Sequence, residues 1–196
     1  MRNTSIVALR VAVIAAMVAV AAQAQMRPIA WSHEAEAVVD ANGNLHVPHA
    51  YRTTYQFLGS WAVASDQGQG AKELHVVYAS PGAVTAYRNT GGFPDGAVLV
   101  KEVYMATTGQ MTTGTVSRAG TLKGWFVMMK DKHARYPSNG LWGDGWGWAL
   151  FEAKEPERNV ATNYRTDCKT CHLPAKQDDW LYVRGYPVLK DQAKAR

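Results

Sequence analysis

The sequence PDGAVLVKEVYM, residues 94–105, decides the fold because it joins a tight turn to an apolar strand. Residues 94–96 are typical turn residues, and the β-branched, apolar-rich run over residues 97–105 predicts a strand that carries Lys101 and Glu102. Three further strands are expected at residues 73–79, 122–129 and 146–153. The sequence therefore predicts that a β-sheet is the main element of the fold.

Two short helices are expected beside this sheet. The apolar spacing of residues 51–63 suits a short helix. Ser80 is expected to cap a second helix that has Pro81 at its first position and ends at Gly91 and Gly92. Because helical periodicity is weak elsewhere, the sequence predicts an α+β domain built mainly on an antiparallel sheet.

The run Cys168-Lys169-Thr170-Cys171-His172 contains the only two cysteines of the chain. In this spacing, two thiols can add to the vinyl groups of haem while the following histidine binds iron. A surface disulfide and a thioredoxin-like pair are the alternatives, but that redox motif usually lies early, between a strand and a helix, and needs no trailing histidine. We therefore expect one haem c, attached through Cys168 and Cys171, with His172 as an axial ligand of the iron.

The position of this motif and the composition of the chain before it exclude two common classes of haem protein. A small electron-carrying cytochrome c has its motif near the N-terminus and a Met ligand well downstream, whereas the 24 residues that follow His172 contain neither Met nor His. A four-helix cytochrome c′ needs long amphipathic helices, which the Gly-, Trp- and Thr-rich middle of this chain lacks. We expect a β-rich haem protein whose iron has an open sixth position.

Residues 1–24 have the pattern of a secretory signal peptide. Arg2 and Arg10 are basic, residues 11–21 are apolar without a break, and Ala24 ends the small-residue pattern expected before cleavage. A stable membrane anchor needs about 20 apolar residues, so we expect a cleaved signal and no such anchor. Residues 25–196 would then form one haem domain in the periplasm, since c-type haem is attached outside the bacterial cytoplasm.

The charge of the chain is mild. It has 21 basic and 16 acidic residues, and removal of Arg2 and Arg10 with the signal leaves 19 and 16, a net charge of +3. The basic residues are scattered, and no nucleic-acid motif or polybasic tail is present, so we expect no nucleic-acid partner. This charge is compatible with an acidic electron-transfer partner.

Several stretches of the chain together resemble the cytochrome P460 family, which includes the β-sheet cytochromes c′. They are residues 45–52, 76–81, 92–102, 129–132 and 168–189. The haem motif alone does not indicate a family, but its combination with Asp-Gly-x-Val-x-Val-Lys-Glu in residues 95–102 is much narrower. The resemblance implies a homodimer with a mainly antiparallel β-fold and one five-coordinate haem per chain.

Lys101 is the residue on which the functional prediction depends. In P460 enzymes, a lysine at the corresponding place bonds covalently to a porphyrin meso carbon and alters the electronics of the iron. The resemblance therefore implies a haem cross-linked to Lys101. A lysine in an apolar strand is costly to bury as an ammonium and shifts toward the neutral, nucleophilic amine. The strand pattern alone also permits Lys101 to point outward to solvent.

The residues near the open face of the iron are predicted less directly. The family includes enzymes that oxidise hydroxylamine, and the resemblance implies this reaction here; because the reaction releases protons, a general base should help. The resemblance aligns the family's carboxylate with Asn163, which cannot accept a proton at neutral pH, and a family arginine with His75. These two residues are the candidates for the distal pocket. Glu157 and Asp167 are alternative bases, although each is more often a surface charge, and His75 can equally be a partly buried strand histidine.

Two functions of different classes remain open. The first is a periplasmic P460-like oxidoreductase that converts hydroxylamine, alone or with nitric oxide, to more oxidised nitrogen and passes electrons to a soluble cytochrome. The second is a cytochrome c′-like protein that binds nitric oxide without turning over hydroxylamine. Lys101 favours the enzyme and Asn163 favours the binding protein. We give the lysine more weight because the cross-link defines the cofactor.

Overall fold

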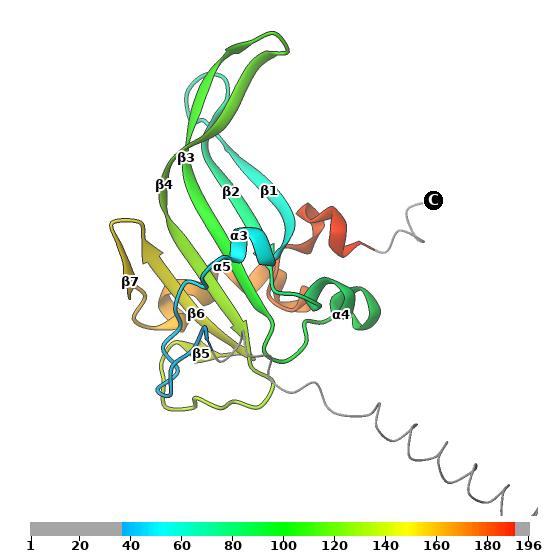
Figure 1. Ribbon diagram of the computed structural model, residues 1–196, viewed down its shortest axis with the longest axis vertical. Helices are drawn as coiled ribbons and strands as arrows, with labels where there is room; N and C mark the ends of the chain where they lie inside the picture. The colour runs from blue at the N-terminus through cyan, green and yellow to red at the C-terminus, as the bar shows by residue number, and fades with distance from the viewer. Residues whose placement is uncertain (1–36, 191–196) are drawn as a thin grey trace, which may run out of the picture. The chain divides into compact units, whose positions relative to one another are not determined.

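The computed structural model describes residues 37–190, in which seven strands form an antiparallel sheet (Figure 1). The strands are β1 (Gln56–Ala64), β2 (Ala71–Ala79), β3 (Val98–Met111), β4 (Gly114–Lys130), β5 (Trp142–Gly143), β6 (Trp146–Glu152) and β7 (Glu155–Asn159). Their order across the sheet is β1-β2-β3-β4-β6-β5, and β7 pairs with β6. The prediction of a mainly antiparallel sheet with short helices is confirmed.

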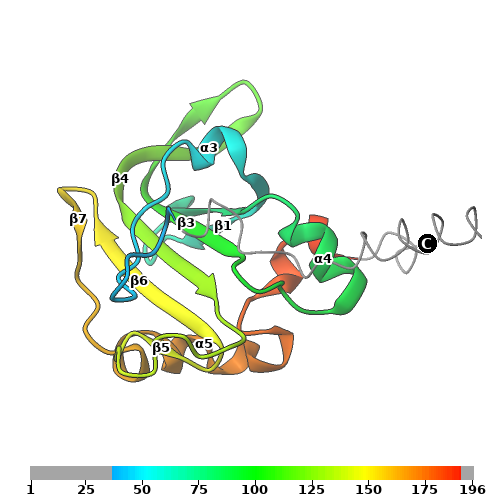
Figure 2. The same ribbon diagram turned by 60° about the horizontal axis from the view of Figure 1, so that its bottom comes forward.

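Short helical segments lie on both faces of this sheet. They are the α-helices α3 (Tyr51–Thr54), α4 (Ala83–Thr90) and α5 (Thr170–His172), the π-helical turn η1 (Arg165–Lys169), and the 3₁₀ turns η2 (Leu173–Asp178), η3 (Val183–Gly185) and η4 (Pro187–Leu189). Figure 2 shows α3 and α5 on opposite faces of the sheet. The main apolar core joins α4 and the C-terminal segment to the sheet face on which α5 lies.

The predicted strands at residues 73–79, 97–105, 122–129 and 146–153 are all present, but two of them are longer than expected. Strand β3 continues to Met111 and β4 begins at Gly114, so the two strands form one long hairpin. The hairpin turns at Thr112 and Thr113, and Gly114, which follows them, has φ of 117°, a backbone conformation that favours glycine. The extension is rich in Thr and Gly and has little apolar alternation, which is why its sequence does not indicate a strand.

The predicted helix over residues 51–63 is wrong for most of its length. Only Tyr51–Thr54 is helical, and Gln56–Ala64 forms the edge strand β1, which pairs with β2. The pairing has a β-bulge between Phe57 and Gly59. This bulge shifts the side-chain alternation along the strand, so the apolar residues no longer follow a period of two.

The predicted capping of the second helix is also corrected. The helix α4 begins after Gly82, and the Ser80 hydroxyl accepts a hydrogen bond from the Val98 main-chain nitrogen at 2.9 Å. Ser80 therefore joins the start of β3 to the end of β2. Gly91 ends the helix as predicted, with φ of 75° and its N–H donated to the Tyr87 carbonyl.

Alternation along β3 places Lys101 and Glu102 on opposite faces of the sheet. Glu102 is only 2% exposed, and its carboxylate accepts hydrogen bonds from the Tyr51 hydroxyl and, at 2.6 Å, from Arg52 Nε. Trp125 Nε1 donates to the Tyr51 hydroxyl at 2.7 Å. This cluster anchors α3 to the face of the sheet away from Lys101.

The predicted signal peptide, residues 1–24, lies outside the described residues. Within residues 37–190, no helix is long and apolar enough to cross a membrane.

We expect Glu102→Gln to lower the free energy of unfolding by about 1.5–3 kcal/mol, the usual contribution of a hydrogen bond to a charged group. The amide can neither balance the Arg52 guanidinium nor accept as many hydrogen bonds. Denaturant unfolding followed by circular dichroism measures the difference. Glu157→Gln, at an exposed position of β7, should stay within about 0.5 kcal/mol of wild type. Equal stability of the two variants would contradict the prediction.

Candidate haem-attachment site

A cavity of about 460 Å³ lies between the sheet face that carries Lys101 and the C-terminal segment. Its volume is in the range of 300–1,000 Å³ usual for small-molecule and cofactor sites. The residues that line it are Val77, Leu99, Lys101, Phe126, Val127, Met128, Trp148, Ala149 and Leu150 from the sheet, and Asp167, Cys168, Cys171, His172, Leu181, Tyr182 and Tyr186 from the C-terminal segment. The cavity is therefore mainly apolar, with both cysteines on one wall.

Strand register explains the sheet wall of the cavity. Lys101 in β3 is paired with Val77 in β2 and Phe126 in β4, and Phe126 is paired with Leu150 in β6. Residues directly opposite one another in antiparallel strands point to the same face, so these four side chains form one row across the sheet.

Both cysteines belong to the short helical run that follows the sheet. Cys168 is in η1 and Cys171 is in α5, and a separation of three residues on a helical backbone places them on one side. Both are free thiols; Cys168 is half-buried and Cys171 is exposed. Burial raises the pKa of the Cys168 thiol to about 11, so this thiol is protonated at neutral pH.

The imidazole of His172 has a fixed orientation. Its Nδ1 lies 2.7 Å from the Trp180 main-chain oxygen. A carbonyl oxygen can only accept, so Nδ1 carries the proton and the Nε2 lone pair is free. Burial lowers the pKa of His172, which keeps the ring neutral. A metal-binding histidine commonly donates its other N–H to a carbonyl in this way.

Lys101 lies in the wall of the same cavity as the cysteines. Its Nζ is 4.0 Å from the centre of the Phe126 ring. Burial lowers the pKa of this lysine, because the apolar surroundings disfavour the ammonium. Of the two orientations that the strand pattern permits, the structure has the one that faces the cavity.

The two candidates for the distal pocket do not line the cavity. His75 is on β2, two residues before Val77, and its Nε2 lies 3.1 Å from a carboxylate oxygen of Glu73. Asn163 is exposed, and its side-chain oxygen accepts a hydrogen bond from the Arg165 main-chain nitrogen at 2.9 Å. His75 thus shares the cavity's face of the sheet, whereas Asn163 supports the start of η1.

The two alternative bases are placed differently. Glu157 is exposed on β7 and does not line the cavity. Asp167 does line it, and its carboxylate accepts hydrogen bonds from the main-chain nitrogens of Thr162 at 2.8 Å and Asn163 at 3.0 Å. These hydrogen bonds hold the pKa of Asp167 well below its usual range, with the bond from Thr162 as the largest cause. Such a carboxylate is a weak proton acceptor.

Sequence reasoning missed several residues of the site. Phe126 and Leu150 are separated from Lys101 by 25 and 49 positions, and only the strand register reveals that they form one row. Tyr182, whose hydroxyl donates to the Cys171 carbonyl, also belongs to the wall. Alternation over residues 122–129 indicates which side chains of that strand share a face with Phe126. It does not indicate which strands lie beside it.

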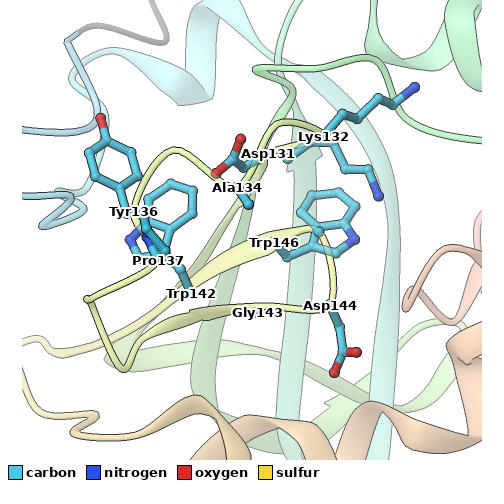
Figure 3. Close-up of a pocket in the computed structure, with 11 residues that line it drawn as sticks. Asp131, Lys132, Ala134, Tyr136, Pro137, Trp142, Gly143, Asp144 and Trp146 are labelled. Carbon is cyan, nitrogen blue, oxygen red and sulfur yellow. The ribbon is translucent and has the colours of Figure 1, made fainter.

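A second hollow, of about 420 Å³, lies beside the loop between β4 and β6. Figure 3 shows Tyr136 and Trp142 together on one side of it and Trp146 and Asp144 on the other. Its lining contains neither cysteine nor histidine. The two thiols, the oriented imidazole and the apolar walls make the first cavity the one that fits a covalently bound haem.

The fold and this site define a class, the β-sheet proteins with a C-terminal motif for c-type haem. The comparison with protein families agrees: the model of the family described as Cytochrome P460 matches residues 48–183. This chain belongs to the cytochrome P460 family and is a c-type haem protein. A search of curated proteins found no match.

We expect acid-acetone extraction of the holoprotein to leave the porphyrin on the chain. Cys171→Ser should retain it through one thioether, since Cys168 also lines the cavity. A variant with both cysteines changed to serine should release it. This double variant is made in a Lys101→Arg background, because the family resemblance implies a further covalent bond at that lysine. Intact mass checks each protein, and free haem extracted from wild type would contradict the assignment.

Proposed function

We propose that this chain is an exported, periplasmic haem oxidoreductase that oxidises hydroxylamine, alone or with nitric oxide. In the proposed site, Cys168 and Cys171 bind the haem, His172 is the axial ligand and Lys101 is cross-linked to the porphyrin. The observation that carries the proposal is the position of Lys101 in the wall of the cavity that both cysteines line. Electrons would pass to a soluble cytochrome, and the protein would act as a homodimer without a stable membrane anchor.

The surroundings of Lys101 support its role as a nucleophile. Its lowered pKa favours the neutral amine, which has a lone pair for bond formation. Bonding of Nζ to a porphyrin carbon is an oxidation in which two electrons and two protons leave, and a peroxide is a class of oxidant that can accept them. The bound haem would supply a redox-active iron with an open position.

The weak basicity of Asp167 limits the expected rate of this reaction. Hydroxylamine must lose protons as it is oxidised, and a well-placed base typically contributes about 10²–10⁴-fold. Asp167 is the one Asp or Glu residue in the cavity lining, and its hydrogen bonds disfavour protonation. We therefore expect slow turnover.

Nitric oxide binding without turnover is the second candidate function. The apolar side chains of Val77, Leu99, Phe126 and Leu181 favour a small uncharged ligand over a charged one. Because residue 163 is an asparagine, this chain also lacks the carboxylate that the family resemblance implies at that place.

We expect Lys101→Arg to convert the spectrum of the ferrous protein to that of an ordinary haem c. Arginine keeps the charge but has no primary amine to form the bond. Wild type should show the strongly red-shifted Soret band that the family resemblance implies, together with a haem peptide that includes Lys101 after digestion. Lys123→Arg, on the neighbouring strand, is the control and should keep the wild-type spectrum. A wild-type spectrum in Lys101→Arg would contradict the cross-link.

We expect wild type to bind nitric oxide readily in the ferrous state and to oxidise hydroxylamine slowly with an artificial electron acceptor. Asn163→Glu should leave this rate unchanged, because the side chain at this position is exposed to solvent. A rate increase of about 10²-fold would instead place position 163 beside the substrate. Complete absence of hydroxylamine oxidation, with nitric oxide binding intact, would favour the second candidate function.

A further inference from the structure

The imidazole of His172 is held by a turn with an unusual backbone conformation. Its Nδ1–H donates to the carbonyl oxygen of Trp180, and both Trp180 and the preceding Asp179 have left-handed backbones, with φ of 67° and 57°. Residues other than glycine rarely adopt this conformation, because Cβ crowds the carbonyl oxygen. Two such residues in succession persist only where the surrounding structure holds them.

The Asp179 carboxylate joins this turn to the rest of the fold. Its Oδ1 accepts hydrogen bonds from Lys130 Nζ and, at 3.3 Å, from Trp146 Nε1. Its Oδ2 accepts from the Phe93 main-chain nitrogen at 2.9 Å. The donors lie at the end of β4, at the start of β6 and in the segment before β3. One carboxylate thus links the turn to three separate parts of the described chain.

Lys130 is also buried and has several contacts. Its side chain is 9% exposed, and its Nζ lies 4.7 Å from the centre of the Trp146 ring. Its main-chain nitrogen donates to the Ala97 carbonyl at 2.8 Å, which fixes the strand end. Lys130 and Trp146 also line the second hollow. Removing either charge of a buried pair leaves the other uncompensated, which is strongly destabilising locally.

We propose that Lys130 and Asp179 are positioning residues for the axial histidine. The ion pair holds the turn, the turn directs the Trp180 carbonyl at Nδ1, and this hydrogen bond sets the orientation and the donor strength of the His172 ring. This role goes beyond the proposed function, since it depends on coordination of the haem iron by His172 and not on the substrate. Residues 129–132 and 168–189, which are far apart in sequence, meet at this pair.

The direction of the effect follows from the hydrogen bond. Donation from Nδ1–H to a carbonyl makes the imidazole more basic, and a more basic axial ligand favours ferric iron. When the ion pair is broken, the turn relaxes and the carbonyl moves away from Nδ1. The bond between iron and histidine then weakens and the reduction potential rises.

The test uses four variants of the haem-loaded protein. Asp179→Asn removes the negative charge but keeps an oxygen for the Phe93 nitrogen, Lys130→Gln removes the positive charge, and Lys130→Arg preserves it. Glu102→Gln is the control, since it makes an acid-to-amide change at a buried carboxylate that pairs with an arginine on the opposite face of the sheet. Resonance Raman spectroscopy gives the iron–histidine stretching frequency of the ferrous protein, and potentiometric titration gives the reduction potential.

We expect Asp179→Asn and Lys130→Gln to lower the stretching frequency and to shift the ferric-to-ferrous equilibrium about tenfold toward ferrous iron. This shift corresponds to about 59 mV for a one-electron couple. Lys130→Arg and Glu102→Gln should keep the wild-type frequency and potential. The proposal would be overturned if Asp179→Asn and Lys130→Gln lost stability, as Glu102→Gln does, but kept the wild-type stretching frequency and reduction potential.

Two further outcomes are decisive. If Asp179→Asn yields no haem-loaded protein, Lys130→Gln and Lys130→Arg decide: a lower frequency in the Gln variant alone supports the proposal, and equal frequencies overturn it. If wild type itself shows no iron–histidine mode in the ferrous state, then His172 does not coordinate the iron, and the positioning role is wrong as well. Hydroxylamine turnover enters neither measurement, so failure of the proposed enzyme activity leaves the inference standing.

Discussion

The antiparallel register between β2, β3 and β4 is the constraint on which both faces of the molecule depend. It aligns Val77, Lys101 and Phe126 in one row on the wall of the haem cavity. A slip of one residue in β3 would exchange the two faces. Lys101 would then meet α3, and the Glu102 carboxylate would enter an apolar cavity beside the haem motif. The buried hydrogen bonds of Glu102 with Tyr51 and Arg52 therefore stabilise the observed register relative to the slipped one.

Closure of the cavity depends on a second contact, between the edge strand and the C-terminal segment. The ring of Trp61 in β1 packs edge to face on Tyr186, with centroids 6.0 Å apart. The indole lies directly over Gly185, where any Cβ would be within 1.9 Å of the Trp61 ring. Only glycine permits this close approach. The contact holds the segment after the haem motif against the sheet, so that His172 and Lys101 line one cavity.

Sequence reasoning reached the parts of the structure that local pattern determines. The strand over residues 97–105 and the helix end at Gly91 follow from β-branched residues and from glycine at a helix terminus. The haem motif follows from the spacing of two thiols and a histidine. In contrast, β1 was not predicted, because a bulge near Gly59 disturbs its alternation.

The residues that orient His172 could not be predicted from local sequence pattern, for a different reason. The Trp180 group that orients His172 is a main-chain carbonyl, and every residue has one. Nothing in the residue type of Trp180 indicates a role toward histidine. Asp179 and Lys130 have informative side chains, but they are 49 positions apart and their meeting depends on the packing of β4 against the C-terminal segment. No short stretch of a single sequence indicates the register of distant strands or the packing of the C-terminal segment on the sheet.

Lys101 and Lys130, which lie on the sheet face toward the C-terminal segment, differ in a way that bears on their chemistry. Lys130 is buried with a carboxylate partner, Asp179, as a lysine is when it serves as an anchor. Lys101 lies in an apolar wall, and within residues 37–190 no carboxylate is within ion-pair distance of its Nζ, which lies over the Phe126 ring. An unpaired ammonium is disfavoured there, and a side chain needed only for packing would be apolar, as its neighbour Val100 is. The burial that lowers the pKa of Lys101 shifts the side chain toward the neutral amine, which is the form that has a lone pair for the cross-link we propose.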